Sequence, residues 1–158
     1  MAVNPWGVIT GCGVGAASPT AHPLAETFFA LRRQPPPGLA RVGASAGGPY
    51  GVDQGFAGPA NPQTWWPADG AQVLCPPKRT SRTPWPKQLR RGRAGVRQIG
   101  ETVYEQLWHT FRLDRERPHD LRGVQVRWAA KMALHNFCMG CNGQLGRPLL
   151  AFTDLVDW

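Results

Sequence analysis

The chain has 158 residues and a formal net charge of +8, with 18 Lys and Arg against 10 Asp and Glu. That length suits a single domain with a hydrophobic core, and no apolar run approaches the roughly 20 residues of a membrane-spanning helix. Four cysteines in a chain of this size do not make a disulfide framework, and no charged segment leads into an apolar signal sequence. We therefore expect a cytoplasmic protein.

The first half of the chain predicts short strands and one helix between loops rich in Gly and Pro. Residues 6–15 (WGVITGCGVG) alternate β-branched residues with glycine, a pattern typical of a strand. Residues 23–33 (PLAETFFALRR) predict a helix, and residues 34–49 predict a loop. A short strand, YGV, is expected to end at Asp53. The apolar residues expected on one face of the helix are Leu24, Phe28 and Leu31.

The middle of the chain is strongly basic. Residues 61–70 predict a short helix, and residues 71–75 predict another short strand. The run that follows contains no Asp or Glu, and its cations are Lys78, Arg79, Arg82, Lys87, Arg90, Arg91, Arg93 and Arg97. Pro84 and Pro86 predict that this run is an extended connector. It is expected to bind polyanions by releasing counterions, and the alternative is a solvated linker that binds nothing.

Two helices are predicted in the C-terminal part. The first spans residues 95–111 and carries Glu101, Glu105 and Trp108 on a different face from its apolar residues. Those apolar residues are Ile99, Val103, Leu107 and Phe111. The second helix spans residues 121–145, and its inward-facing residues are expected to be Val124, Trp128, Met132, His135, Cys138 and Leu145. The order of elements predicts an α/β fold with a short mixed sheet, flanking helices and two C-terminal helices.

Two carboxylates lie where separate elements could bring them together. Asp53 ends a predicted strand beside Gly55, and Glu101 lies on a predicted helix. Mg²⁺ prefers hard oxygen ligands and often takes one or two carboxylates, and paired ions can clamp a phosphoryl group during in-line displacement. The alternatives are a turn Asp with a solvated helical Glu, or a glycosidase-like carboxylate pair, which the basic run disfavours.

Other reactive or aromatic side chains are weaker candidates. Cys138 and Cys141 have the spacing of half a zinc site, but they fall within an apolar helical pattern and are expected to be small buried residues. His109 and His119 are expected at the surface. The seven Trp and six Phe could stack on bases, yet most are expected in the core, with Trp85 in the basic run as an exception.

Several segments, in their order along the chain, resemble the C-terminal half of a bacterial insertion-sequence transposase of the DDE type. They are GVITGCGVGAAS, PLAETFFALRR, YGVDQGF, RQIGETVYEQL, FRLDRERPHDLRG, WAAKMALHNF and LGRPLLAF. The resemblance covers nearly the whole chain and is strongest from Arg97 onward. It implies a partial ribonuclease H-like fold, as in retroviral integrases. D-x-G-F at Asp53 resembles the second catalytic Asp of the family, and R-x-x-x-E resembles the signature around its helical Glu.

The resemblance therefore implies that Asp53 and Glu101 are catalytic ligands for Mg²⁺ or Mn²⁺, and that Arg97 contacts DNA near the cleavage site. The family's first catalytic Asp lies upstream of GVITG, and no Asp precedes Asp53 here. Ala94 and Trp108 stand where some relatives carry Tyr and a cation. We interpret the chain as one N-terminally truncated catalytic domain. Its parts are strands and loops at residues 1–77, a basic linker at residues 78–97, and helices at residues 98–158.

The expected function is transposition of an insertion sequence, by metal-dependent hydrolysis of a phosphodiester at a transposon end and attack of the freed 3′-hydroxyl on target DNA. The chain is expected to be inactive alone, since one catalytic carboxylate is missing. Its expected partners are DNA and either itself or a full-length transposase, at the nucleoid and not at a membrane. The alternative is a non-catalytic basic DNA-binding protein that regulates a full-length transposase.

Overall fold

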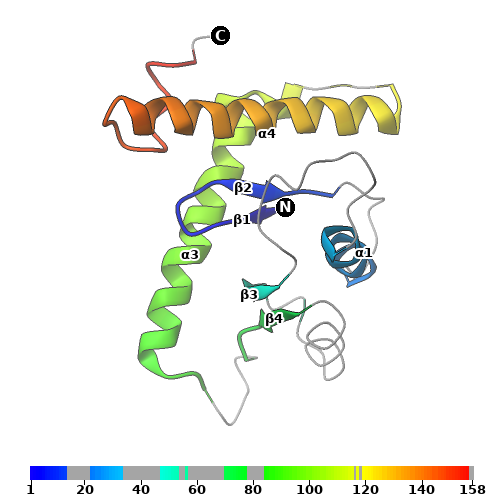
Figure 1. Cartoon of the computed structure of the whole chain (residues 1–158), viewed down its shortest axis with the longest axis vertical. Coiled ribbons are helices and arrows are strands. Elements are labelled where there is room, and N and C mark those ends of the chain that lie inside the picture. Colours follow the sequence, from blue (N-terminus) through cyan, green and yellow to red (C-terminus); the bar gives the residue numbers. More distant parts are fainter. Residues whose placement is uncertain are drawn as a thin grey trace. The chain divides into compact units, whose positions relative to one another are not determined.

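The computed structural model describes residues 1–13, 22–33, 47–53, 56, 70–77, 84–115, 117 and 119–156. These residues form a mixed α/β structure with three α-helices and two two-stranded sheets (Figure 1). The α/β prediction is thus confirmed, although the described strands form two separate pairs and not one mixed sheet. The chain divides into two units, Met1–Val14 with Val96–Trp158, and Gly15–Gly95. The second unit is therefore an insertion in the sequence of the first.

The second unit contains α1 (His22–Arg33) and a parallel pair of strands, β3 (Gly48–Gly51) and β4 (Ala71–Leu74). The strands pair from Gly48 opposite Ala71 to Gly51 opposite Leu74. The predicted strand at residues 71–75 is confirmed to within one residue. The strand before Asp53 is also present, but it begins at Gly48, where the sequence pattern predicted a loop. The short helix predicted at residues 61–70 lies almost wholly outside the described residues.

The helix α1 matches its prediction within one residue, but its buried face differs from the predicted one. Phe29 is buried, whereas Leu24 and Leu31 are 41% and 56% exposed. The Phe29 ring packs edge-on against Tyr50 of β3 with 4.8 Å between ring centroids, and Phe28 lies beside it. An aromatic side chain buries more apolar area than a leucine, so the phenylalanines take the inner face.

The first unit begins with an antiparallel pair, β1 (Ala2–Val3) and β2 (Ile9–Gly11). The strand predicted at residues 6–15 is confirmed only at residues 9–11. The side chain of Asn136 closes one side of this pair. Its Nδ2 donates to the Ile9 carbonyl and its Oδ1 accepts from the Ile9 N–H, both at 2.9 Å. A side-chain amide therefore satisfies the two backbone groups that a neighbouring strand would otherwise pair.

The helix α3 (Lys87–Glu105) contradicts the prediction of an extended connector over residues 87–97. The Arg90 N–H donates to the Pro86 carbonyl at 3.1 Å, so the helix begins directly after the last proline of the run. Proline disrupts a helix interior but is compatible with its start, and the sequence has no further proline until Pro118. The helix continues into a π-helical turn, Gln106–Thr110, and a short 3₁₀ turn follows at Leu113–Arg115.

The helix α4 (Leu121–Gln144) ends one residue before its predicted end. Its N-cap is Asp120, whose Oδ1 accepts from the Gly123 N–H at 2.6 Å. The predicted inward positions Met132, His135 and Cys138 are buried. Val124 and Trp128 are half-buried, and Leu145 is 61% exposed because it lies just after the last helical turn.

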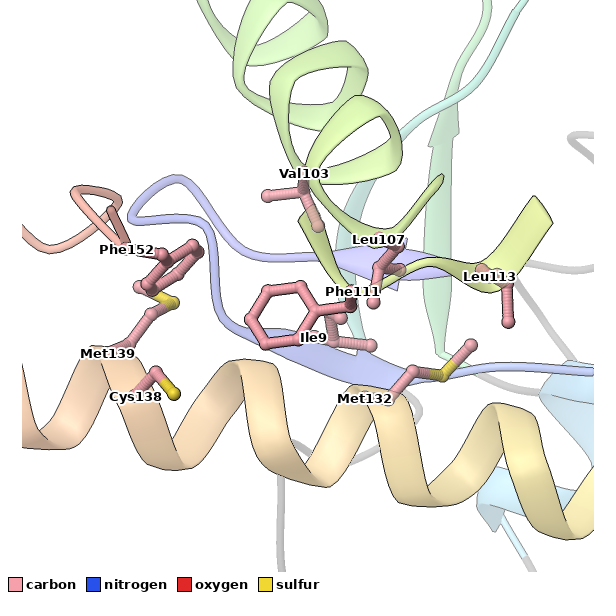
Figure 2. Close-up of a cluster of buried hydrophobic side chains, with 9 residues drawn as sticks. All are labelled: Ile9, Val103, Leu107, Phe111, Leu113, Met132, Cys138, Met139 and Phe152. Atoms are coloured by element: carbon pink, nitrogen blue, oxygen red, sulfur yellow. The ribbon is translucent and has the colours of Figure 1, made fainter. Parts of the chain in front are cut away.

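The core of the first unit joins residues from both ends of the chain (Figure 2). It consists of Ile9, Val103, Leu107, Phe111, Leu113, Met132, Cys138, Met139 and Phe152. The predicted apolar face of the 95–111 helix is confirmed at Val103, Leu107 and Phe111, which are at most 1% exposed, whereas Ile99 is half-buried. The rings of Phe111, His135 and Phe152 pack against one another with centroids 5.0 to 5.7 Å apart.

Candidate nucleic-acid interface

The first part of α3 presents positive charge to solvent. Lys87, Arg90 and Arg91 are exposed, and the sequence has no Asp or Glu between Lys78 and Gly100. Helix formation projects these side chains at fixed spacing, which an extended connector would not do. Exposed Lys and Arg side chains without acidic neighbours along the chain attract phosphates by screened Coulomb forces.

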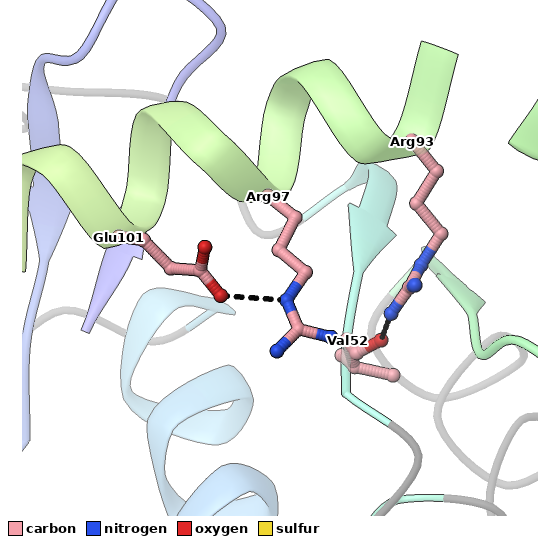
Figure 3. A network of polar contacts seen from close by, with 4 residues as sticks. All are labelled: Val52, Arg93, Arg97 and Glu101. Atoms are coloured by element: carbon pink, nitrogen blue, oxygen red, sulfur yellow. Dashed lines mark hydrogen bonds and ion pairs between the residues drawn. The ribbon is translucent and has the colours of Figure 1, made fainter. Parts of the chain in front are cut away.

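Arg93 differs from the other cations of this part of α3. It is half-buried, and its guanidinium donates to the Val52 carbonyl, which directly follows β3 (Figure 3). This bond ties the start of α3 to the strand pair within the second unit. The remaining predicted cations of the run, Lys78, Arg79 and Arg82, lie outside the described residues.

Arg97 and Glu101 form an ion pair one helical turn apart. Arg97 Nε lies 2.7 Å from Glu101 Oε1, and the two side chains are 57% and 61% exposed (Figure 3). An exposed pair at this spacing stabilises a helix by only about 0.3–0.5 kcal/mol. Arg97 and Glu101, the residues of the R-x-x-x-E motif, thus lie together on a helix, where a ligand from solution can reach both charged groups.

Asp53 is also exposed, two residues after β3 ends. Its carbonyl accepts hydrogen bonds from the Phe56 N–H at 3.0 Å and from Cys75 Sγ at 3.4 Å, which fix the backbone at this point. Asp53 belongs to the second unit, whereas Glu101 belongs to the first. Neither unit by itself therefore contains both predicted metal ligands.

Among the described residues, no three His, Cys, Asp or Glu side chains gather closely enough to hold a metal ion. Each unit offers a single hard-oxygen ligand of the predicted pair. Mg²⁺ usually takes one or two protein carboxylates, so each unit by itself supplies at most part of the predicted site.

Two aromatic side chains stack on the exposed face of the C-terminal part of α3 and the π-helical turn. The rings of Tyr104 and Trp108 have centroids 5.8 Å apart and planes 15° apart. They are 50% and 36% exposed. Trp108 lies on a different face from the buried apolar residues, as predicted, whereas Trp6, which is 68% exposed, is an exception to the expectation that most Trp lie in the core. Two aromatic residues four positions apart on a predicted helix were the signal available in the sequence for this stack.

The remaining candidates are structural. Cys138 is buried, and burial, followed by the neighbouring Cys141, raises the pKa of its thiol. A neutral buried thiol packs like a small apolar residue, as predicted. His109 and His119 are exposed, also as predicted.

No helix in the described parts of the chain has both the length and the apolar character needed to cross a membrane. Comparison of the chain with models of protein families, with curated proteins and with solved structures gives no match.

Proposed function

We propose that the chain is part of the catalytic domain of a DDE-type transposase, with a partial ribonuclease H-like fold, and that it binds DNA through α3. The observation that carries the proposal is the exposed Arg97–Glu101 pair on a helix that begins with exposed cations. The sequence motif R-x-x-x-E and its position on a solvent-facing helix agree with the family's arrangement. Transposition of an insertion sequence, at the nucleoid, is the process in which such a domain acts.

Phosphate contacts supply the binding energy in this proposal. Lys87, Arg90 and Arg91 would neutralise DNA phosphates and release condensed counterions, which positions a duplex without reading its sequence. Arg97 would contact DNA beside Glu101. Arg93 already binds the Val52 carbonyl, so we assign it a smaller share of the phosphate contacts.

The resemblance also assigns Asp53 and Glu101 to Mg²⁺ or Mn²⁺, which in this family activates the attacking oxygen and stabilises the leaving one. Because each unit by itself contributes one of these carboxylates, we derive no cleavage step for this chain. We propose DNA binding without strand cleavage for the chain alone. Association with a second copy or with a full-length transposase is the route by which it would take part in the reaction.

The second candidate is a non-catalytic basic DNA-binding protein that regulates a full-length transposase. The exposed cations of α3 favour it, because phosphate binding by Lys87, Arg90 and Arg91 requires no metal. The two candidates differ in the role of the carboxylates. Weaker Mn²⁺ binding to the DNA complex after Asp53→Ala or Glu101→Ala supports the transposase, and unchanged Mn²⁺ binding supports the regulator.

The DNA-binding proposal is tested by measuring affinity for a short duplex against salt concentration. Replacing Lys87, Arg90 and Arg91 together by Gln should reduce the slope of log K against log salt by up to about 2.7, at about 0.9 per phosphate contact. The matched control replaces Arg115, Arg117 and Arg122 by Gln, which removes the same charge from exposed positions outside α3. Equal slopes in the two triple variants would show that only net charge matters, and the proposed interface would be wrong.

A further inference from the structure

The stacked pair of Tyr104, at the end of α3, and Trp108, in the π-helical turn, lies outside the core cluster of the first unit. Val103 and Leu107, which neighbour Tyr104 and Trp108 in sequence, are buried at 0% and 1%, whereas the two rings lie on the outer face. With exposed fractions of 50% and 36%, Tyr104 and Trp108 forgo a substantial part of their burial, which is the main stabilising contribution of aromatic side chains. An aromatic pair at this spacing adds only a few tenths of a kcal/mol to a helix, so helix stability alone is a weak reason for it.

The pair lies in line with charged groups. Steps of four, three and four residues along the helix lead from Arg97 to Glu101, Tyr104 and Trp108, so all four side chains share one face. The ion pair at 2.7 Å offsets the negative charge of Glu101 next to the rings. Seven residues separate Arg97 from Tyr104, which is about 10 Å along a helix. At about 3.4 Å per phosphate along one strand, that distance corresponds to about three nucleotides.

The charge of the chain selects among the ligands that stack on aromatic rings. Flat partners include nucleic-acid bases and proline-rich peptides, and both can cover a Tyr–Trp pair. The same helix begins with Lys87, Arg90 and Arg91, and the chain carries a net charge of +8. Positive side chains together with stacked aromatic rings are the combination that binds single-stranded nucleic acid. Bases inside a duplex are already stacked on both faces, so an unpaired base, whose faces are free, is the ligand that fits the rings best.

We infer that Tyr104 and Trp108 form a stacking platform for an unpaired base at the end of a DNA strand, whose phosphates run along α3 toward Arg97. This inference rests on the proposed DNA-binding function and specifies its substrate as a duplex with a single-stranded end. Stacking tolerates any base, because every base has a flat π face, so the platform reads the end of the strand and not its sequence.

The test compares three labelled duplexes of equal paired length: one blunt, one with a four-nucleotide 3′ overhang and one with a four-nucleotide 5′ overhang. We expect the wild-type chain to bind one overhang duplex more tightly than the blunt one. Tyr104→Ala and Trp108→Ala should weaken overhang binding by about 5-fold to 150-fold and leave blunt-duplex binding unchanged. Trp108→Phe should retain most of the overhang preference, since it keeps a ring. Trp108→Leu, which stays apolar, should lose it.

Trp6→Ala is the matched control, because Trp6 is an exposed indole of the same unit that no α3 residue stacks on. It should leave binding to all three duplexes unchanged. Equal affinity of the wild-type chain for blunt and overhang duplexes, or equal losses on both in Trp108→Ala, would overturn the inference while salt-dependent blunt-duplex binding still supports the proposed function. Absence of binding to every duplex would overturn both. Tighter binding of a proline-rich peptide than of any duplex would assign the platform to a protein partner.

Discussion

The side-chain amide of Asn136 should be one of the strongest single stabilising contacts between the two ends of the chain. Asn136→Ala removes both 2.9 Å hydrogen bonds to the backbone of Ile9, 127 positions away in sequence. A typical hydrogen bond contributes about 0.5–1.5 kcal/mol net, and the upper half applies here because the Ile9 side chain is only 7% exposed. The loss is thus about 2–3 kcal/mol, of which Ala returns about 0.5 kcal/mol through its helix propensity.

We expect urea unfolding, followed by circular dichroism, to give Asn136→Ala a free energy of unfolding about 1.5–2.5 kcal/mol below that of the wild type. Asn4→Ala is the control. It also removes two hydrogen bonds, from the Trp6 and Val8 N–H groups at 3.0 and 2.9 Å, but both are local in sequence and the first is exposed. A loss below 0.5 kcal/mol for Asn136→Ala, or an equal loss for Asn4→Ala, would refute the reasoning about long-range burial.

Two further predictions concern the first unit. Burial lowers the pKa of His135, so the folded state favours the neutral imidazole. The contribution of neutral His135 to the free energy of unfolding should be fully present above about pH 6.5 and should decrease as the pH drops below that value. Unfolding measured from pH 7.5 to 5 should show a smaller pH dependence in His135→Leu than in the wild type. Gly7 has φ 96°, and a Cβ there would lie 2.9 Å from Leu150 Cδ2, so Gly7→Ala should cost about 1–3 kcal/mol. Gly140→Ala, on an exposed turn of α4 with open space around it, should instead raise the midpoint of thermal unfolding.

Local signals in the sequence predicted a helix well where capping residues define both of its ends. The 24 residues of α4 follow an N-cap, Asp120, and end before a glycine, Gly146, with φ 66°. The start of α3 differs from the prediction, because Pro84 and Pro86 do not prevent helix over the whole basic run. Their effect ends at Pro86, whose carbonyl already accepts the first helical hydrogen bond.

Strand pairing was harder to predict, because it depends on partners far apart in sequence. Nothing near Ile9 indicates that its backbone groups pair with Asn136, or that β3 pairs with β4 in parallel. The candidate site shows the same contrast between local spacing, which the sequence reveals, and tertiary contacts, which it does not. The R-x-x-x-E spacing is local, and once α3 forms it brings Arg97 and Glu101 together at 2.7 Å. Whether Asp53 joins them depends on tertiary structure, and the described contacts assign it to the other unit.

The discontinuous first unit also has a consequence for folding during synthesis. Residues 15–95 form a unit that is continuous in sequence, whereas the Ile9 backbone meets its partner Asn136 only after α4 has been made. At about 5–20 residues per second, the 127 positions between Ile9 and Asn136 take about 6–25 s to translate. During that time the backbone groups of Ile9 lack their native partner, and a nascent chain exposes a strand edge that chaperones or neighbouring chains can bind. β2 is thus among the first elements to be made, but it receives its hydrogen bonds from Asn136 only when α4 has been synthesised.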